Sequence, residues 1–118
     1  MSVTFRPGLR ESVNLLIGLI GASGGGKTMS GMRLAKGIAG DKPFAVIDTE
    51  ARRALHYADQ FRFDHADLRS PFMPGAYADA IQAADDAKYP VILVDSASHE
   101  HAGVGGILDM QEAEYARL

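Results

Sequence analysis

The feature that most constrains this chain is a glycine-rich stretch between an apolar run and a helical pattern. Gly21–Thr28 fits G-x-x-x-x-G-K-S/T at every fixed position. Glycines let the backbone fold back so that several N–H groups converge on one anion. The helix that follows turns the positive end of its dipole toward the same point. An ordinary glycine-rich turn does not need Lys-Thr after its last glycine, so the stretch predicts a phosphate-binding loop.

Each position of this loop has an expected role. The backbone is predicted to surround the phosphates, Lys27 to place its charge on the β- and γ-phosphates, and Thr28 to offer its hydroxyl to Mg²⁺. The predicted binding residues are Gly21, Ala22, Ser23, Gly24, Gly25, Gly26, Lys27 and Thr28.

Strand-like and helix-like segments alternate along the rest of the chain. Apolar runs typical of buried strands occupy 14–20, 44–47 and 91–94, and a third strand in chain order is expected within 61–68. Helical patterns cover 27–38, 76–88 and 108–118, with a weaker one at 51–60. This alternation predicts an α/β fold, a mainly parallel sheet flanked by helices.

The ends of the chain carry two further expectations. Residues 1–13 show no clear period around Pro7-Gly8, which predicts an arm ahead of a single domain spanning 1–118. The helical pattern at the other end has no terminal glycine or other stop, which predicts that the sequence is a piece of a longer chain.

Composition excludes several classes of protein. The net charge of −3 and the 47% hydrophobic content argue against a disordered chain and against a uniformly basic nucleic-acid binder. Without cysteine there is no disulfide, thiolate zinc site or thiol nucleophile. No apolar run reaches the roughly 18–20 residues that span a bilayer, so no membrane partner is expected.

Asp95 is the predicted metal carboxylate. It ends the apolar run 91–94, and ligands of open α/β sheets bind at the carboxyl ends of strands, so Asp95 is expected near Lys27 and Thr28. A helix-capping or turn aspartate is the alternative interpretation, since such residues often follow strands.

Glu50 and Asp48 compete for the role of positioning an attacking water. Both follow the apolar run 44–47, and either carboxylate could instead stabilise the N-terminus of the next helix. His99-Glu100-His101 lacks a third ligand for a metal site, although Glu100 is a further acidic candidate near the nucleotide. Arg52-Arg53 could contact phosphate, and Tyr57 could stack on a base, but solvent and core are their ordinary places.

Two segments beyond the glycine loop carry a family resemblance. Phe44–Ala51 with Tyr57-Ala58, the Ala-rich helical pattern and Val91–Ser96 resemble the ATPase core of RecA-type recombinases. The stretch 15–114 as a whole is similar to phage-encoded RecA-like nucleotide-binding proteins, often labelled AAA-family ATPases, and this likeness lies in Asp48–Ala58 and Val94–Glu100.

The resemblance implies a P-loop NTPase (RecA-like) core that uses ATP and Mg²⁺. It implies that Glu50 activates water, that Asp95 serves the metal site, and that ATP hydrolysis is coupled to phage or prophage DNA recombination or replication. A homo-oligomer in the cytoplasm of a bacterial host is the implied setting. RecA-type DNA-contacting loops follow the Asp-Ser strand by several dozen residues, and only 23 residues follow Asp95 here. Single-stranded DNA binding is therefore assigned to no residue of this chain.

Two other functions remain open on the sequence. A small-molecule phosphotransferase would need an arginine-bearing lid, which is not visible, and a non-catalytic nucleotide-binding assembly module would suit the short chain. A GTPase is disfavoured because the only asparagine is Asn14, which leaves no base-reading Asn-Lys-x-Asp motif, and Ser98 stands where Asp-x-x-Gly needs glycine.

Overall fold

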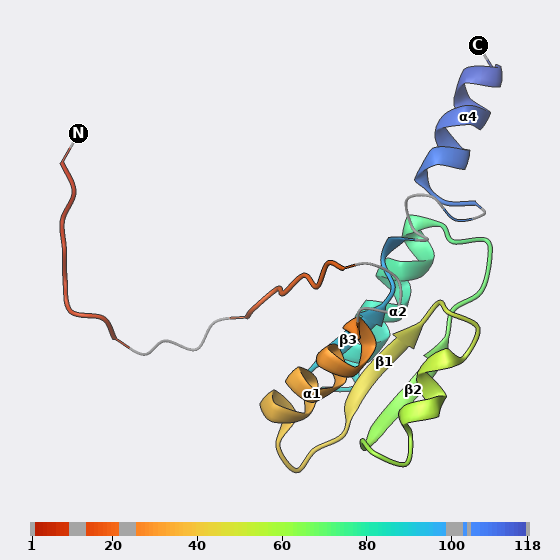
Figure 1. The fold of residues 1–118 in the computed structure, drawn as a ribbon. Helices are drawn as coiled ribbons and strands as arrows, with labels where there is room; N and C mark the ends of the chain where they lie inside the picture. The colour runs from red at the N-terminus through yellow and green to blue at the C-terminus, as the bar shows by residue number, and fades with distance from the viewer. Residues whose placement is uncertain (1, 10–13, 22–25, 99–102, 104, 118) are drawn as a thin grey trace.

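The computed structural model describes residues 2–9, 14–21, 26–98, 103 and 105–117 (Figure 1). Its elements in chain order are α1 (Lys27–Ala39), β1 (Phe44–Asp48), η1 (Arg53–Tyr57, a 3-10 helix), β2 (Phe63–Asp67), α2 (Pro74–Asp86), β3 (Ile92–Asp95) and α4 (Ile107–Arg117). This is a small α/β fold, as the alternation of segments predicts.

The described strands form one parallel sheet in the order β2-β1-β3. β1 is central and buried along its whole length, because it is paired on both edges and covered on both faces. β3 is only half-buried, although its apolar sequence predicts a strand enclosed on both faces. The register pairs Asp48 with Asp95, so the carboxyl ends of β1 and β3 meet at the same edge of the sheet.

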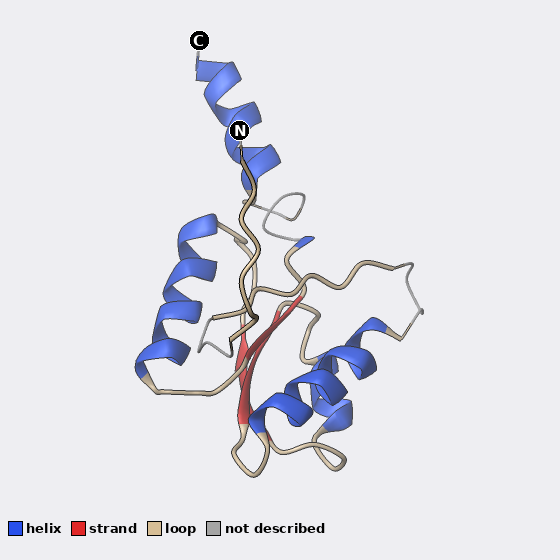
Figure 2. Cartoon of the chain, turned by 90° about the vertical axis from the view of Figure 1, so that its left-hand side faces the viewer, coloured by secondary structure: helices blue, strands red, loops and turns tan. Residues whose placement is uncertain are grey.

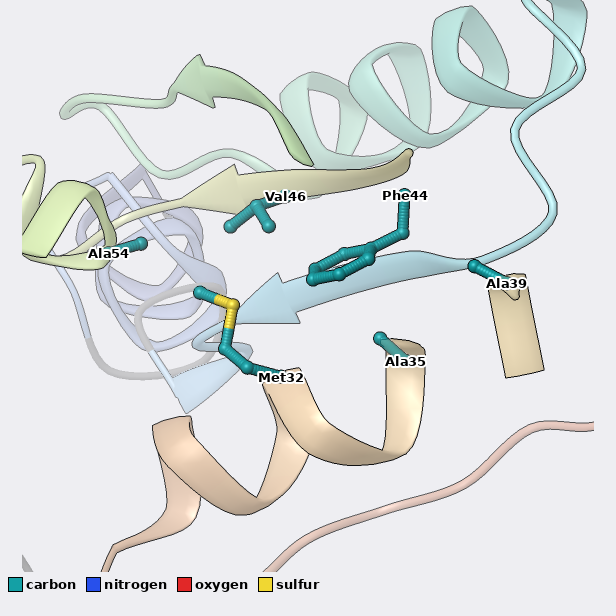
Figure 3. Packing of buried hydrophobic residues seen from close by; sticks show 6 residues of the cluster. All are labelled: Met32, Ala35, Ala39, Phe44, Val46 and Ala54. Carbon is teal, nitrogen blue, oxygen red and sulfur yellow. The ribbon is translucent and has the colours of Figure 1, made fainter. Parts of the chain in front are cut away.

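Helices cover the sheet from both sides, giving three layers (Figure 2). On one face, Met32, Ala35 and Ala39 of α1 pack against Phe44 and Val46 of β1. Ala54 of η1 closes the same cluster (Figure 3). The other face of β1 carries the buried Ala45 and Ile47 and lies against α2, which buries Tyr77 and Ala84. The alternation of side chains along β1 thus supplies both faces of the core.

α1 begins at the residue predicted from the glycine loop and lies close to the sheet. A Cβ atom on Gly31 would come within 3.1 Å of the Leu93 side chain, so a glycine here permits close approach of α1 to β3. The helix ends at Gly40, whose φ of 64° is in the left-handed region that favours glycine.

The prediction of a strand at 14–20 is wrong for this structure. The described residues 14–21 form no strand, and Leu16 and Ile20 are fully exposed. The apolar run has no neighbouring strand to pair with, and a strand needs such pairing to satisfy its backbone groups. Leu19 nevertheless reaches α1, since its side chain lies 3.4 Å from the Cβ position of Gly31.

Two weakly predicted segments, 51–60 and 61–68, each contain a regular element. The weak helix of 51–60 is the short η1, and the strand expected within 61–68 is β2. α4 buries none of its residues and lies apart from the sheet in Figure 1. The described residues of the N-terminal arm, 2–9, are exposed and without regular structure. Among the described segments, no helix has the length and apolar character to cross a membrane.

Candidate functional site

A cavity of about 640 Å³ opens where the carboxyl ends of β1 and β3 meet the N-terminus of α1. Its volume falls within the range of ligand-binding pockets, roughly 300–1,000 Å³. The described residues that line it are Gly26, Lys27, Thr28, Glu50, Arg53, His56, Tyr57, Asp95, Ser96 and Ser98. Parallel strands direct their carboxyl ends to one edge, which is why residues far apart in sequence meet here.

Thr28 and Asp95 are in direct contact, as expected from the position of Asp95 after its strand. The Thr28 hydroxyl Oγ1 donates a hydrogen bond to Asp95 Oδ2 at 2.9 Å, across 67 positions of sequence. A hydroxyl and a carboxylate side by side are hard oxygen donors of the kind that Mg²⁺ prefers. The capping alternative for Asp95 is not needed to explain where this side chain lies.

The pKa of Asp95 is raised from its ordinary value of 3.8. Burial is the main cause, and the negative charges of Glu50 and Asp48 add to it. The Thr28 hydrogen bond and the positive charge of Lys27 act in the opposite direction. Protein groups therefore do not fully compensate the charge of this carboxylate, and a cation at this position would favour the ionised form.

The glycine loop is described only at its two ends. Ala22, Ser23, Gly24 and Gly25 lie outside the described residues. At one end the Lys27 ammonium donates to the carbonyl of Gly21 at 2.7 Å. At the other end Gly26, with φ at 82°, precedes α1 as its N-cap and makes no side-chain capping bond. The first turn of α1, with its positive dipole end, borders the cavity through Gly26, Lys27 and Thr28.

The two carboxylates that follow β1 lie in different surroundings. Glu50 lines the cavity, and its Oε1 accepts a hydrogen bond from Ser96 Oγ at 3.0 Å. Asp48 is fully buried and accepts hydrogen bonds from the amides of Glu50 and Ala54 at 2.8 and 3.1 Å. The third partner of Asp48 is His65 Nε2, at 2.8 Å. Glu50 is therefore the carboxylate that can reach a ligand, and Asp48 is the one that stabilises the start of the next helix.

The sequence left phosphate contact or solvent open for Arg53 and base stacking or core for Tyr57, and it did not single out His56. Arg53 is exposed and Tyr57 packs against the core cluster, and both line the cavity together with His56 from η1. Residues three apart lie one above the other on a 3-10 helix, so Arg53 and His56 share a face. The chain reaches this position through a turn in which Ala51 and Arg52 both have left-handed φ angles, 53° and 67°. Neither residue type favours that conformation, so the sequence gives little warning of the turn.

Ser96 fastens the ends of the two strands together. Its amide donates to Thr49 Oγ1 at 2.8 Å, and Thr49 Oγ1 donates to the carbonyl of Ser96 at 3.0 Å. Tyr77 of α2 donates to the same carbonyl at 3.0 Å. The Ser96 hydroxyl contacts both Glu50 and Ser98. These contacts fix the position of Glu50 relative to Asp95.

A magnesium nucleotide fits the donor set of this site. Within the described ranges, no group of three or more His, Asp or Glu side chains could hold a metal ion by itself. A cation beside Thr28 and Asp95 would therefore draw its remaining ligands from phosphate and water, which is how Mg²⁺ is usually bound. His99, Glu100 and His101 lie outside the described residues, so the structure does not bear on Glu100 as an alternative to Glu50.

No protein-family model, curated protein or solved structure matches this chain.

Proposed function

We propose that the chain binds ATP with Mg²⁺ in the cavity and hydrolyses the γ-phosphate, as a P-loop NTPase of RecA-like type. The observation that carries the proposal is the hydrogen bond between Thr28 and Asp95, which unites the end of the glycine-loop motif with the carboxylate of a distant strand. The raised pKa of Asp95 supports it, because a bound cation would relieve the cost of ionising this group.

The residues of the site divide the work of hydrolysis. Lys27 and the first amides of α1 neutralise the phosphate charge, which shifts to the β–γ bridging oxygen as its bond to the γ-phosphorus breaks and water takes its place. Thr28 and Asp95 are the residues that would hold Mg²⁺, which would supply further positive charge to the phosphates. Glu50 accepts a hydrogen bond from the attacking water and orients it toward the γ-phosphorus. Ser96 keeps the Glu50 carboxylate in position through its hydroxyl.

Two variants of the purified chain test binding and hydrolysis separately. Lys27→Ala should weaken Mg²⁺–ATP binding by at least about a hundredfold in isothermal titration calorimetry, because it removes the main phosphate charge. Lys36→Ala is the matched control, since it removes a lysine from the exposed side of the same helix. Equal affinities in the two variants would overturn the phosphate-loop assignment.

Glu50→Gln should retain ATP affinity and slow phosphate release by about a hundredfold or more. Glu112→Gln, on the exposed surface of α4, is its control. ATP binding without phosphate release in the unaltered chain would point instead to a non-catalytic nucleotide-binding module. Release that requires a small-molecule acceptor would point to a phosphotransferase.

The proposed setting is phage or prophage DNA recombination or replication, and it is supported by the likeness of 44–51 and 91–96 to RecA-type cores. A recombination ATPase hydrolyses ATP faster when single-stranded DNA is present. Phosphate release should therefore be measured with and without an oligonucleotide, at several salt concentrations because DNA binding depends on salt. A rate that rises with DNA would support this setting and place DNA contacts within this chain. A rate that is independent of DNA would show that this chain alone does not couple hydrolysis to DNA, in keeping with DNA binding being assigned to none of its residues, and would leave the nucleotide assignment intact.

A further inference from the structure

Asp48 is the most deeply buried acidic side chain in the described part of the molecule. It has no direct role in the proposed hydrolysis. Its side chain is fully buried, yet it does not face the cavity. Its Oδ1 accepts from the amide of Glu50, and its Oδ2 accepts from the amide of Ala54 and lies 2.8 Å from His65 Nε2. Three hydrogen-bond partners offset the cost of burying this carboxylate, so Asp48 can hold the backbone amides of Glu50 and Ala54 in fixed positions.

The two amides belong to the turn that carries Glu50. One carboxylate thus binds both ends of the segment 50–54. Between these ends lie Ala51 and Arg52, both with left-handed φ angles that residues with a Cβ seldom adopt. Such a conformation persists only when the surroundings impose it. Asp48 therefore fixes the backbone of Glu50 and the start of η1 in an otherwise unfavourable arrangement.

His65 provides the support from the neighbouring strand. It lies on β2 opposite Val46 of β1, and its side chain reaches diagonally to Asp48, with only 13% of it exposed. With its proton on Nε2, the ring donates a hydrogen bond to Asp48 Oδ2 across 2.8 Å. Without His65, the buried carboxylate keeps only the two turn amides and becomes less constrained in orientation.

We propose that Asp48 and His65, the Asp48–His65 pair, are positioning residues for the water-orienting carboxylate of Glu50. The pair acts through the backbone of 50–54 and touches no nucleotide. This inference rests on the proposed function, since it assigns the pair to the hydrolytic step of the same site. It predicts that loss of the pair lowers the rate of hydrolysis and leaves ATP binding by Lys27 and Thr28 intact.

The first experiment compares His65→Leu with His65→Gln in steady-state ATPase assays. His65→Leu should lower kcat about tenfold to a hundredfold and change KM by less than about twofold, because a small misplacement of a catalytic group slows chemistry far more than binding. His65→Gln should recover most of kcat, since its amide nitrogen can donate to Asp48. Asp64→Asn on the same strand is the control, because Asp64 is exposed, lies opposite Ala45 rather than Asp48, and bonds only to Tyr89 among the contacts described.

A second measurement does not depend on turnover. Amide hydrogen exchange across 50–54 should be faster in His65→Leu than in the unaltered chain and close to normal in His65→Gln. An unchanged exchange rate in 50–54 together with an unchanged kcat in His65→Leu would overturn the inference. So would a KM that rises in step with the fall in kcat, since that pattern indicates general damage to the site.

These outcomes separate the inference from the function on which it rests. If the unaltered chain releases no phosphate, the proposed hydrolysis fails, and unperturbed exchange in His65→Leu would in addition remove the pair as a positioning device. If Glu50→Gln abolishes hydrolysis but His65→Leu retains full kcat, the pair alone is overturned. Asp48→Asn serves as a further variant, because its amide group must face one of the N–H donors. It should lose kcat while retaining ATP affinity.

Discussion

Asp48 and Asp95 occupy equivalent positions at one edge of the sheet, but their surroundings are opposite. Each ends an apolar parallel strand, and the two face each other in register. Asp48 is buried and has three partners within the protein. Asp95 is half-buried, accepts from Thr28, borders the cavity and has a raised pKa. The same sequence pattern thus produces a structural carboxylate and a ligand-facing one, and the available donors decide which is which.

The largest expected effect is on stability, when either of the two aspartates is replaced by alanine. Asp48→Ala leaves one buried amide, one part-buried amide and a histidine without their acceptor, so the free energy of unfolding should fall by about 3 kcal/mol. Asp95→Ala, which removes one contact at the edge of a cavity, should cost much less. Urea unfolding followed by circular dichroism measures both. Equal losses would contradict the distinction between the two aspartates.

The next effect concerns the metal. Asp95→Asn should lower the affinity for Mg²⁺–ATP by about tenfold to a hundredfold, because the asparagine retains the Thr28 hydrogen bond but lacks the charge that attracts the cation. Affinity for ATP measured in the presence of EDTA should change little. Calorimetric titrations with and without Mg²⁺ measure both affinities. An equal loss of ATP affinity under both conditions would contradict the assignment of Asp95 to the metal site.

The raised pKa of Asp95 predicts a pH dependence of stability in the absence of nucleotide. A folded-state pKa above 3.8 means that the folded protein binds more protons than the unfolded chain between the two values. The contribution of Asp95 to stability therefore falls as pH rises through that window. Asp95→Asn should be more stable than the unaltered chain near pH 7, and this difference should shrink toward pH 4. Paired urea titrations at the two pH values test the sign.

The smallest effect is expected at the left-handed turn held by Asp48. Arg52→Gly should stabilise the fold by about 0.5 kcal/mol, because glycine accepts a φ of 67° without steric conflict. The same change should reduce the loss of unfolding free energy caused by His65→Leu, because a glycine at position 52 lowers the conformational cost of the turn. A double-mutant cycle of Arg52→Gly with His65→Leu measures that coupling. Strict additivity would separate the turn from the Asp48–His65 pair.

Much of the fold could be predicted because its signals are local. The periodicity of α1 and α2 and the apolar character of β1 and β3 are written in short stretches of sequence. The nearness of Thr28 and Asp95 also followed, since the carboxyl ends of parallel strands share one edge.

The failures have non-local causes. The run 14–20 is as apolar as 44–47, but strand formation requires a partner, and the described structure gives it none. The residues alone leave Asp48 and Glu50 open as the water-positioning carboxylate, because the difference in their surroundings comes from His65, 17 positions away from Asp48. It also comes from a turn at Ala51 and Arg52, whose residue types do not signal it. The half-buried state of β3 reflects its place at the edge of the described sheet, which strand sequence alone does not reveal.

The shared carbonyl of Ser96 has a mechanical consequence. Thr49, which follows β1, and Tyr77 on α2 both donate to this one oxygen. Tyr77 is buried and belongs to α2, the helix that covers the face of the sheet opposite to α1 (Figure 2). A displacement of the Ser96 backbone next to Asp95 would have to lengthen or break its bond with Tyr77 or move the phenol hydroxyl with it, so the hydrogen bond ties α2 to the carboxyl end of β3.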